Sequence, residues 1–138
     1  MHNYVWDRIM QKQAARFHRA VNLANQGNAI GQYEMGLRYK NGWGVEPEHQ
    51  KATDLLDRAS RQHHAGACYE LSRFYLERRD YNKALEYTNF ASDEHAELFS
   101  GIEGYNQQHY IQELKKLQKV IDTLSASSLN SNYHTYRR

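Results

Sequence analysis

One pattern of small and large residues occurs twice in this chain, and the repetition restricts what the chain can fold into. The residue pairs 36 positions apart are Ala29 and Ala65, Met35 and Leu71, Gly36 and Ser72, and Tyr39 and Tyr75. Further pairs, 32 positions apart, are Lys51 and Lys83, Ala52 and Ala84, and Ala59 and Ala91. A period in the mid-thirties is typical of helix hairpins that bury their apolar faces against their neighbours. The repeat therefore predicts an all-α fold, an α-α superhelix.

The hairpin positions follow from apolar spacing and from helix-ending residues. Apolar residues at helical spacing predict helices over residues 4–26, 28–41 and 47–62. Between the last two lies "NGWGVEP", where Gly42 and Gly44 permit left-handed backbone and Pro47 suits a first helical turn. We interpret this segment as a tight connector, with Val45 tucked beneath it. Gly36 is in the middle of a helix, which predicts close approach of a neighbouring helix.

These elements predict one domain of six or seven helices over residues 1–124. It consists of a helix at 4–26, repeats at 28–62 and 64–92, and a degenerate C-terminal hairpin at 94–124. The last helix of this hairpin is expected from about 106 to 124. Residues 125–138, "SASSLNSNYHTYRR", are polar and unpatterned, and we expect them to form a flexible tail.

Composition excludes several classes of protein. Lys and Arg number 18 and Asp and Glu 16, interspersed through the chain, which disfavours nucleic-acid binding. No apolar run approaches the roughly 18 residues that span a bilayer, and we expect no membrane partner.

Cys68 is the single cysteine, and the N-terminal segment does not resemble a signal peptide. The expected location is the cytoplasm.

The first repeat resembles the Sel1-like repeat, A-x-x-x-x-x-L-G-x-x-Y-x-x-G-x-G-V followed by K-A and a later A. The matching residues are Ala29, Met35, Gly36, Tyr39, Gly42, Gly44, Val45, Lys51, Ala52 and Ala59. Methionine in place of leucine is the one departure. The second repeat, with "DYNKALEY" and no G-x-G-V loop, is more similar to the related tetratricopeptide repeat. The resemblance implies a right-handed solenoid of helix hairpins with a concave binding side, and a small bacterial protein without catalytic residues.

Candidate contact residues lie on the first helix of each hairpin, away from its small residues. They are Tyr33, Glu34, Arg38, Tyr69, Glu70, Arg73 and Glu77. Tyrosine offers apolar area with a polar tip, and charged residues can fix the register of a bound peptide. Packing in the core or at its edge is an alternative role for Tyr33 and Tyr69. Solvent-exposed ion pairs are the alternative for the charged residues.

The histidines and the single cysteine suggest other functions. His63, His64 and Cys68 suggest a metal site or a thiol nucleophile, but no spaced cluster of three or four ligands accompanies them. Burial of Cys68 as a small apolar residue is the simpler interpretation. The basic segments "KKLQK" and "YRR" suggest nucleic-acid contact but are diluted by acidic residues. We expect no cofactor and no metal.

The sequence therefore predicts a non-enzymatic adaptor or regulator that binds a segment of a partner protein on the concave face. A self-associating structural protein is the alternative, as a homo-oligomer formed through the repeat surface or the last helix. A metal- or thiol-dependent enzyme that uses Cys68 and a nearby histidine is the other.

Overall fold

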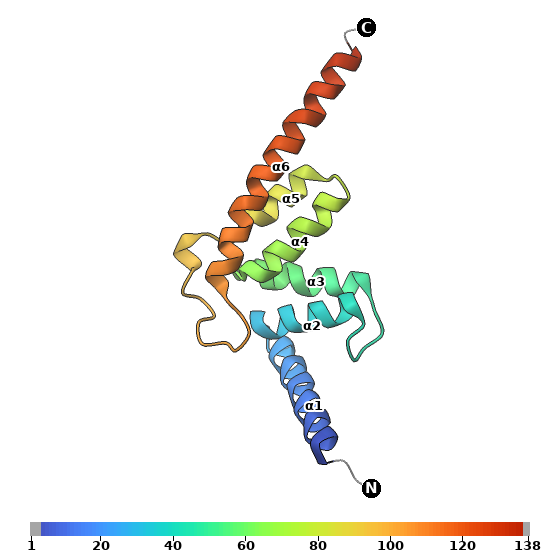
Figure 1. The fold of residues 1–138 in the computed structure, drawn as a ribbon, viewed down its shortest axis with the longest axis vertical. Helices are drawn as coiled ribbons and strands as arrows, with labels where there is room; N and C mark the ends of the chain where they lie inside the picture. Colours follow the sequence, from blue (N-terminus) through green and yellow to red (C-terminus); the bar gives the residue numbers. More distant parts are fainter. Residues whose placement is uncertain (1–3, 137–138) are drawn as a thin grey trace. The chain divides into compact units, whose positions relative to one another are not determined.

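The computed structural model describes residues 4–136, with side chains up to residue 128, and the chain forms two compact units, residues 1–59 and 60–138. The described residues form six α-helices and one short 3-10 helix, without strands, and this confirms the all-α prediction (Figure 1). The helices are α1 (Tyr4–Asn25), α2 (Ala29–Asn41), α3 (His49–Ser60), α4 (Ala65–Glu77), α5 (Tyr81–Thr88), η1 (Asp93–His95) and α6 (Gln107–Tyr136).

In the first unit, α2 packs against both α1 and α3 through its glycines. A Cβ atom added to Gly31 would lie 2.3 Å from the Ala24 backbone nitrogen and 2.7 Å from the Ala20 oxygen. A Cβ atom added to Gly36 would lie 2.8 Å from Leu56 Cγ. The close approach predicted at Gly36 is therefore confirmed.

The α2–α3 connector follows the chemistry expected of its glycines. Gly42 ends α2 with φ 73°, and its amide donates to the Arg38 carbonyl at 2.8 Å. Gly44 is also left-handed, with φ 76°. The Glu48 amide donates to the Tyr39 carbonyl at 3.0 Å and closes the loop. Pro47 precedes the helix instead of lying in its first turn, because α3 begins at His49.

In the second unit, α6 packs against both helices of the α4–α5 hairpin. The buried residues of this core are Ala65, Cys68, Ala91, Ile111 and Leu114. Side chains cap the N-termini of both hairpin helices. His64 Nδ1 accepts from the Ala67 amide at 3.2 Å, and Asp80 Oδ1 accepts from the Lys83 amide at 3.2 Å.

The C-terminal segment differs from the expected hairpin at 94–124 with a following tail. Residues 93–95 form the 3-10 helix and residues 96–106 form turns, where Phe99, Gly101 and Gly104 have positive φ. Such backbone cannot continue a helix. The last helix begins where expected but extends to Tyr136, so residues 125–136 are helical and are not a tail. They contain neither glycine nor proline, and nothing interrupts the helix.

The expectation that residues 1–124 form a single domain stays a prediction. Within residues 4–136, no helix combines the length and the apolar character needed to cross a bilayer.

Candidate functional site

Three tyrosine rings line up where α4 meets the start of α6. The ring centroids of Tyr69 and Tyr110 are 5.8 Å apart, and those of Tyr110 and Tyr105 are 5.5 Å apart with planes 17° from parallel. All three side chains are partly buried. Packing against one another holds the three rings in place. Because each ring is only partly buried, part of its apolar surface remains exposed.

A charged residue extends this line along α4. Arg73 is exposed, and its guanidinium carbon lies 5.5 Å from the Tyr69 ring centroid. This distance is within the range of a cation–π contact. Glu77 is exposed one turn further on, and Glu70 is half-buried. We call the series Arg73, Tyr69, Tyr110 and Tyr105 the aromatic row.

Hydrogen bonds hold the start of α6 against the N-terminus of α4. The Gly66 amide donates to the Tyr105 hydroxyl at 3.0 Å, and the Ala65 amide donates to Gln107 Oε1 at 3.1 Å. The Tyr105 hydroxyl donates to the same Gln107 oxygen. Gln107 Nε2 in turn donates to the His63 carbonyl at 2.6 Å. Burial raises the pKa of Tyr105 well above its ordinary value, so the phenol remains a donor.

Sequence reasoning missed Tyr105, Gln107 and Tyr110. One signal was present in "YNQQHY", because asparagine favours a helix N-terminus. The Asn106 side chain accepts from the His109 amide at 3.1 Å and caps α6. The contact of these residues with α4 spans about 40 positions of sequence, as in the bond between Gly66 and Tyr105, and no local pattern reports it.

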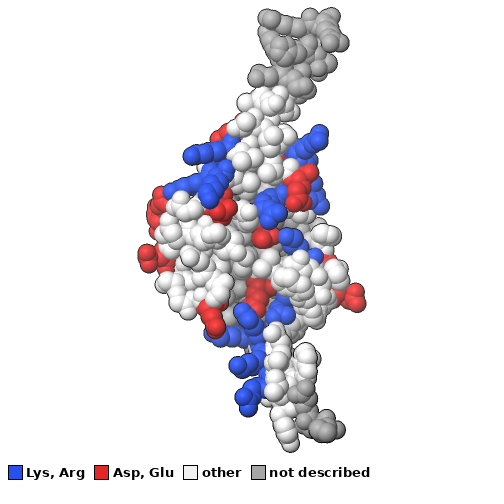
Figure 2. All heavy atoms as spheres, in the orientation of Figure 1, with Lys and Arg blue, Asp and Glu red and all other residues white. Residues whose placement is uncertain are grey.

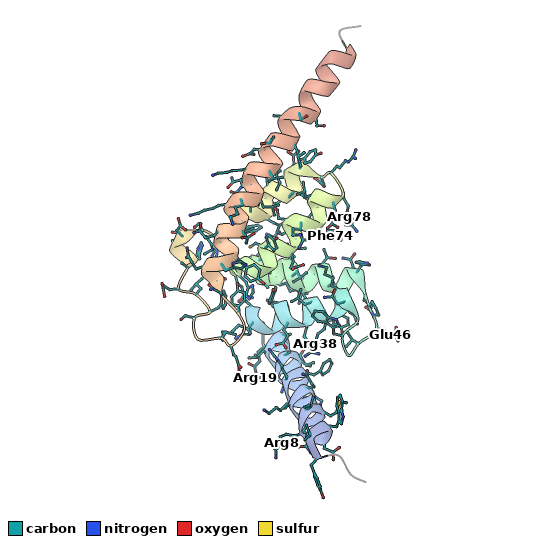
Figure 3. The ribbon with its side chains drawn as sticks, viewed as in Figure 1. Arg8, Arg19, Arg38, Glu46, Phe74 and Arg78 are labelled. Carbon is teal, nitrogen blue, oxygen red and sulfur yellow. The ribbon has the colours of Figure 1, made fainter. Side chains whose placement is uncertain are left out.

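In the first unit, the candidates Tyr33 and Glu34 are half-buried on α2, and Arg38 is nearly covered. The Arg38 side chain is 13% exposed. Its guanidinium lies 5.2 Å from the Phe17 ring centroid, lies 3.5 Å from Glu34 Oε1, and donates to the Trp43 carbonyl at 3.4 Å. Arg38 therefore ties α2 to α1 and to the connector, and Figure 3 labels it on α2.

The first unit also has a hollow of about 290 Å³. It is lined by Val21, Ala24, Asn25, Met35, Tyr39, Lys51, Asp54, Leu55 and Arg58. Lys51 Nζ lies 5.3 Å from the Tyr39 ring centroid. Gln50 Nε2 donates to Asp54 Oδ1 at 3.1 Å. The lining combines apolar residues with side chains of both charges, so the hollow has no strong preference for an anion or a cation.

Cys68 and His64 are buried in the second unit and have structural contacts. Burial raises the pKa of the Cys68 thiol to about 12 and lowers the pKa of His64 to about 3. The thiol lies 3.8 Å from the Ser60 carbonyl. At neutral pH the thiol is therefore protonated, which argues against a nucleophile. Among the described residues, no group of three or more His, Cys, Asp or Glu side chains is placed to hold a metal ion.

The comparison with protein families fits the helix hairpins. The family model of the Sel1 repeat matches residues 29–64 and 65–94, which contain α2 with α3 and α4 with α5. The chain contains two Sel1 repeats. Sel1 repeats generally mediate protein–protein interactions. Comparison with curated proteins and with solved structures gave no match.

The two Sel1 repeats share one helix–helix contact in different chemical forms. In the first repeat, a Cβ atom at Gly36 would lie 3.5 Å from the Ala52 carbonyl oxygen. In the second, the Ser72 hydroxyl donates to the Ala84 carbonyl at 2.8 Å. The residue pairs 36 and 72, and 52 and 84, thus occupy equivalent places in their hairpins.

Proposed function

We propose that this protein is a non-enzymatic adaptor that binds a segment of a partner protein on the aromatic row. The observation that carries the proposal is the continuity of the row, in which Arg73, Tyr69, Tyr110 and Tyr105 follow one another at 5.5 to 5.8 Å. Tyrosine and arginine are enriched among the residues that dominate binding energy at interfaces. Rings that are already packed lose little conformational freedom on binding.

The chemistry of the row defines the segment that it would bind. An apolar or aromatic side chain of the partner would pack on Tyr69 and Tyr110. An acidic residue beside it would pair with Arg73, and a basic residue would pair with Glu77 one turn away. Opposite charges at neighbouring turns of α4 would fix the direction of the segment, because the reversed segment brings like charges together.

In the first unit, Tyr33 and Glu34 remain predicted contact residues for a partner. Arg38 is held by contacts within its own unit, and we expect it to position the connector instead of contacting a partner.

The single cysteine supports a reducing compartment, and we propose a bacterial, cytoplasmic setting for the adaptor.

The experiment that tests the proposal is affinity capture from a lysate of the source cells, quantified by mass spectrometry. The variants Arg73→Glu and Glu77→Lys change exposed side chains, so folding is preserved and is checked by circular dichroism. We expect both variants to lose the same captured proteins, by about tenfold or more, the effect of losing about 1.4 kcal/mol at an interface.

Lys119→Glu is the matched control. Lys119 is exposed on α6, nine residues after Tyr110, which places it about half a turn round the helix from that ring. The control is expected to capture the same proteins as the wild type. Equal capture by all four proteins would refute the assignment of the aromatic row.

A further inference from the structure

The first half of α1 exposes a set of large apolar side chains. The exposed fractions are 68% for Val5, 62% for Trp6, 43% for Ile9 and 64% for Met10. We call residues 4–13 the α1 arm, and Figure 1 shows it extending beyond α2. Monomeric proteins rarely expose apolar side chains in such a contiguous group, and a group of this kind marks an interaction surface.

Basic side chains lie along one flank of this apolar face. Arg8, Lys12 and Arg19 are exposed at helical spacing, whereas Asp7 is the one acidic residue of the arm. Arg16, on the same flank, lies 3.6 Å from Glu34. Figure 2 shows the basic side chains along α1 beside an uncharged strip, and Figure 3 labels Arg8 and Arg19. The surface therefore combines apolar area with positive charge.

The apolar side of the arm is the same side on which α1 packs against α2 further along. Trp6 and Met10 are followed at helical spacing by Phe17 and Ala20, and Ala20 is 1% exposed beneath α2. A flat bilayer laid on this side of the arm would meet α2. A single helix is about 10 Å across, so it needs no more room beside the arm than α2 takes further along α1.

We infer that the α1 arm binds an amphipathic helix of a partner protein, one with an apolar face and an acidic flank. The apolar face would cover Trp6, Ile9 and Met10, and the acidic flank would lie against Arg8 and Lys12. This surface is distinct from the aromatic row, and the inference does not depend on the proposed function.

Trp6 provides its own reporter for a test. The chain has two tryptophans, so Trp43→Phe leaves Trp6 as the sole one. The probes are two synthetic helical peptides with the same leucine face, one flanked by glutamates and the other by lysines. We expect the glutamate peptide to shift Trp6 emission to shorter wavelength, with a Kd about tenfold or more below that of the lysine peptide.

A charge reversal makes the test specific. In the Arg8→Glu, Lys12→Glu variant, which changes two exposed side chains, the preference is expected to reverse in favour of the lysine peptide. The inference is wrong if neither peptide shifts Trp6 emission or if charge reversal leaves the preference unchanged. It is also overturned if anionic lipid vesicles alone give the larger shift, or if the emission shifts with protein concentration alone, which indicates a second copy as the occupant.

Discussion

Gly36 on α2 lies directly against Leu56 on α3, where an added Cβ atom would be 2.8 Å from Leu56 Cγ. Leu56 is 4% exposed, so its side chain fills the space that glycine leaves. The second repeat has Ser72 at the equivalent position and turns its hydroxyl to the Ala84 carbonyl. A residue no larger than serine thus allows the two helices of each hairpin to approach.

Alanine at Gly36 is expected to destabilise the protein by about 1 kcal/mol, although alanine favours helix, because Leu56 must move in a packed core. Gly31→Ala is expected to cost about 2 kcal/mol or more, since its Cβ would meet backbone atoms that cannot move aside. Urea unfolding of both variants measures these costs.

The size-swap variant Gly36→Ala, Leu56→Ala checks the cause of the first effect. Leu56→Ala alone is expected to cost about 2–5 kcal/mol. The double variant should lose less free energy of unfolding than the two single losses combined, because the new methyl group enters the space left by leucine. Strict additivity would mean that Leu56 is not what excludes alanine.

Gly42→Ala is expected to destabilise the protein more than Gly27→Ala. Both glycines are left-handed, with φ 73° and 77°, so each substitution incurs about 1–2 kcal/mol of backbone strain. A Cβ at Gly42 would also lie 2.8 Å from Pro47 Cγ, whereas at Gly27 it would have nothing within 4 Å. Thermal unfolding compares the two, and equal losses would contradict the contact with Pro47.

Stability is expected to fall between pH 7 and pH 5 because of His64. Burial lowers its pKa to about 3 in the folded protein, against 6.5 ordinarily, so the unfolded chain binds the proton more readily. Below pH 6.5 acid therefore favours unfolding, and the free energy of unfolding should decrease by about 2 kcal/mol from pH 7 to pH 5.

His64→Asn is the matched variant for this effect. Asparagine keeps a side-chain acceptor for the Ala67 amide, as a good N-cap residue, but does not titrate. Denaturant unfolding at both pH values should give the variant a smaller loss than the wild type by that amount. Identical pH dependence in the two proteins would place the acid sensitivity elsewhere.

Cys68 is expected to react slowly with thiol reagents in the folded protein. Its side chain is 0% exposed, and burial raises the pKa of the thiol to about 12, so the reactive thiolate is scarce at neutral pH. Alkylation rates at pH 8, with and without denaturant, measure the protection. If the native protein reacts at a rate close to that of the denatured protein, Cys68 is accessible, and the alternative of a thiol-dependent enzyme is supported.

The ends of the hairpin helices could be predicted from the sequence because single residues determine where these helices begin and end. Gly42 ends α2 with the left-handed backbone that glycine permits. Asn28, a residue type that favours helix N-termini, caps α2 by accepting from the Ile30 amide at 2.9 Å. The sequence predicts the end of α6 too early, at residue 124, because the polar residues 125–138 were expected to form a tail. An exposed helix without glycine or proline needs no apolar residues to continue.

The candidate site was predictable in part. Tyr69 and Arg73 share one side of α4, and helical spacing alone places them together. Tyr110 and Tyr105 complete the row from more than 30 positions away, through contacts that involve Gln107 and the start of α4. For Arg38, the i, i+4 spacing places its side chain beside Glu34 on α2. No local pattern indicates its contact with Phe17, because that contact depends on how α1 packs against α2.

Photocrosslinking from the aromatic row tests the central claim most directly. A benzophenone amino acid placed at His109, an exposed residue whose ring centroid lies 5.3 Å from that of Tyr110, keeps all four residues of the row. In source cells it should form a covalent product with a partner protein on illumination, and the same amino acid placed at Lys119 should not. Products from both positions in equal yield, or from neither, would contradict an adaptor that binds its partner on the aromatic row.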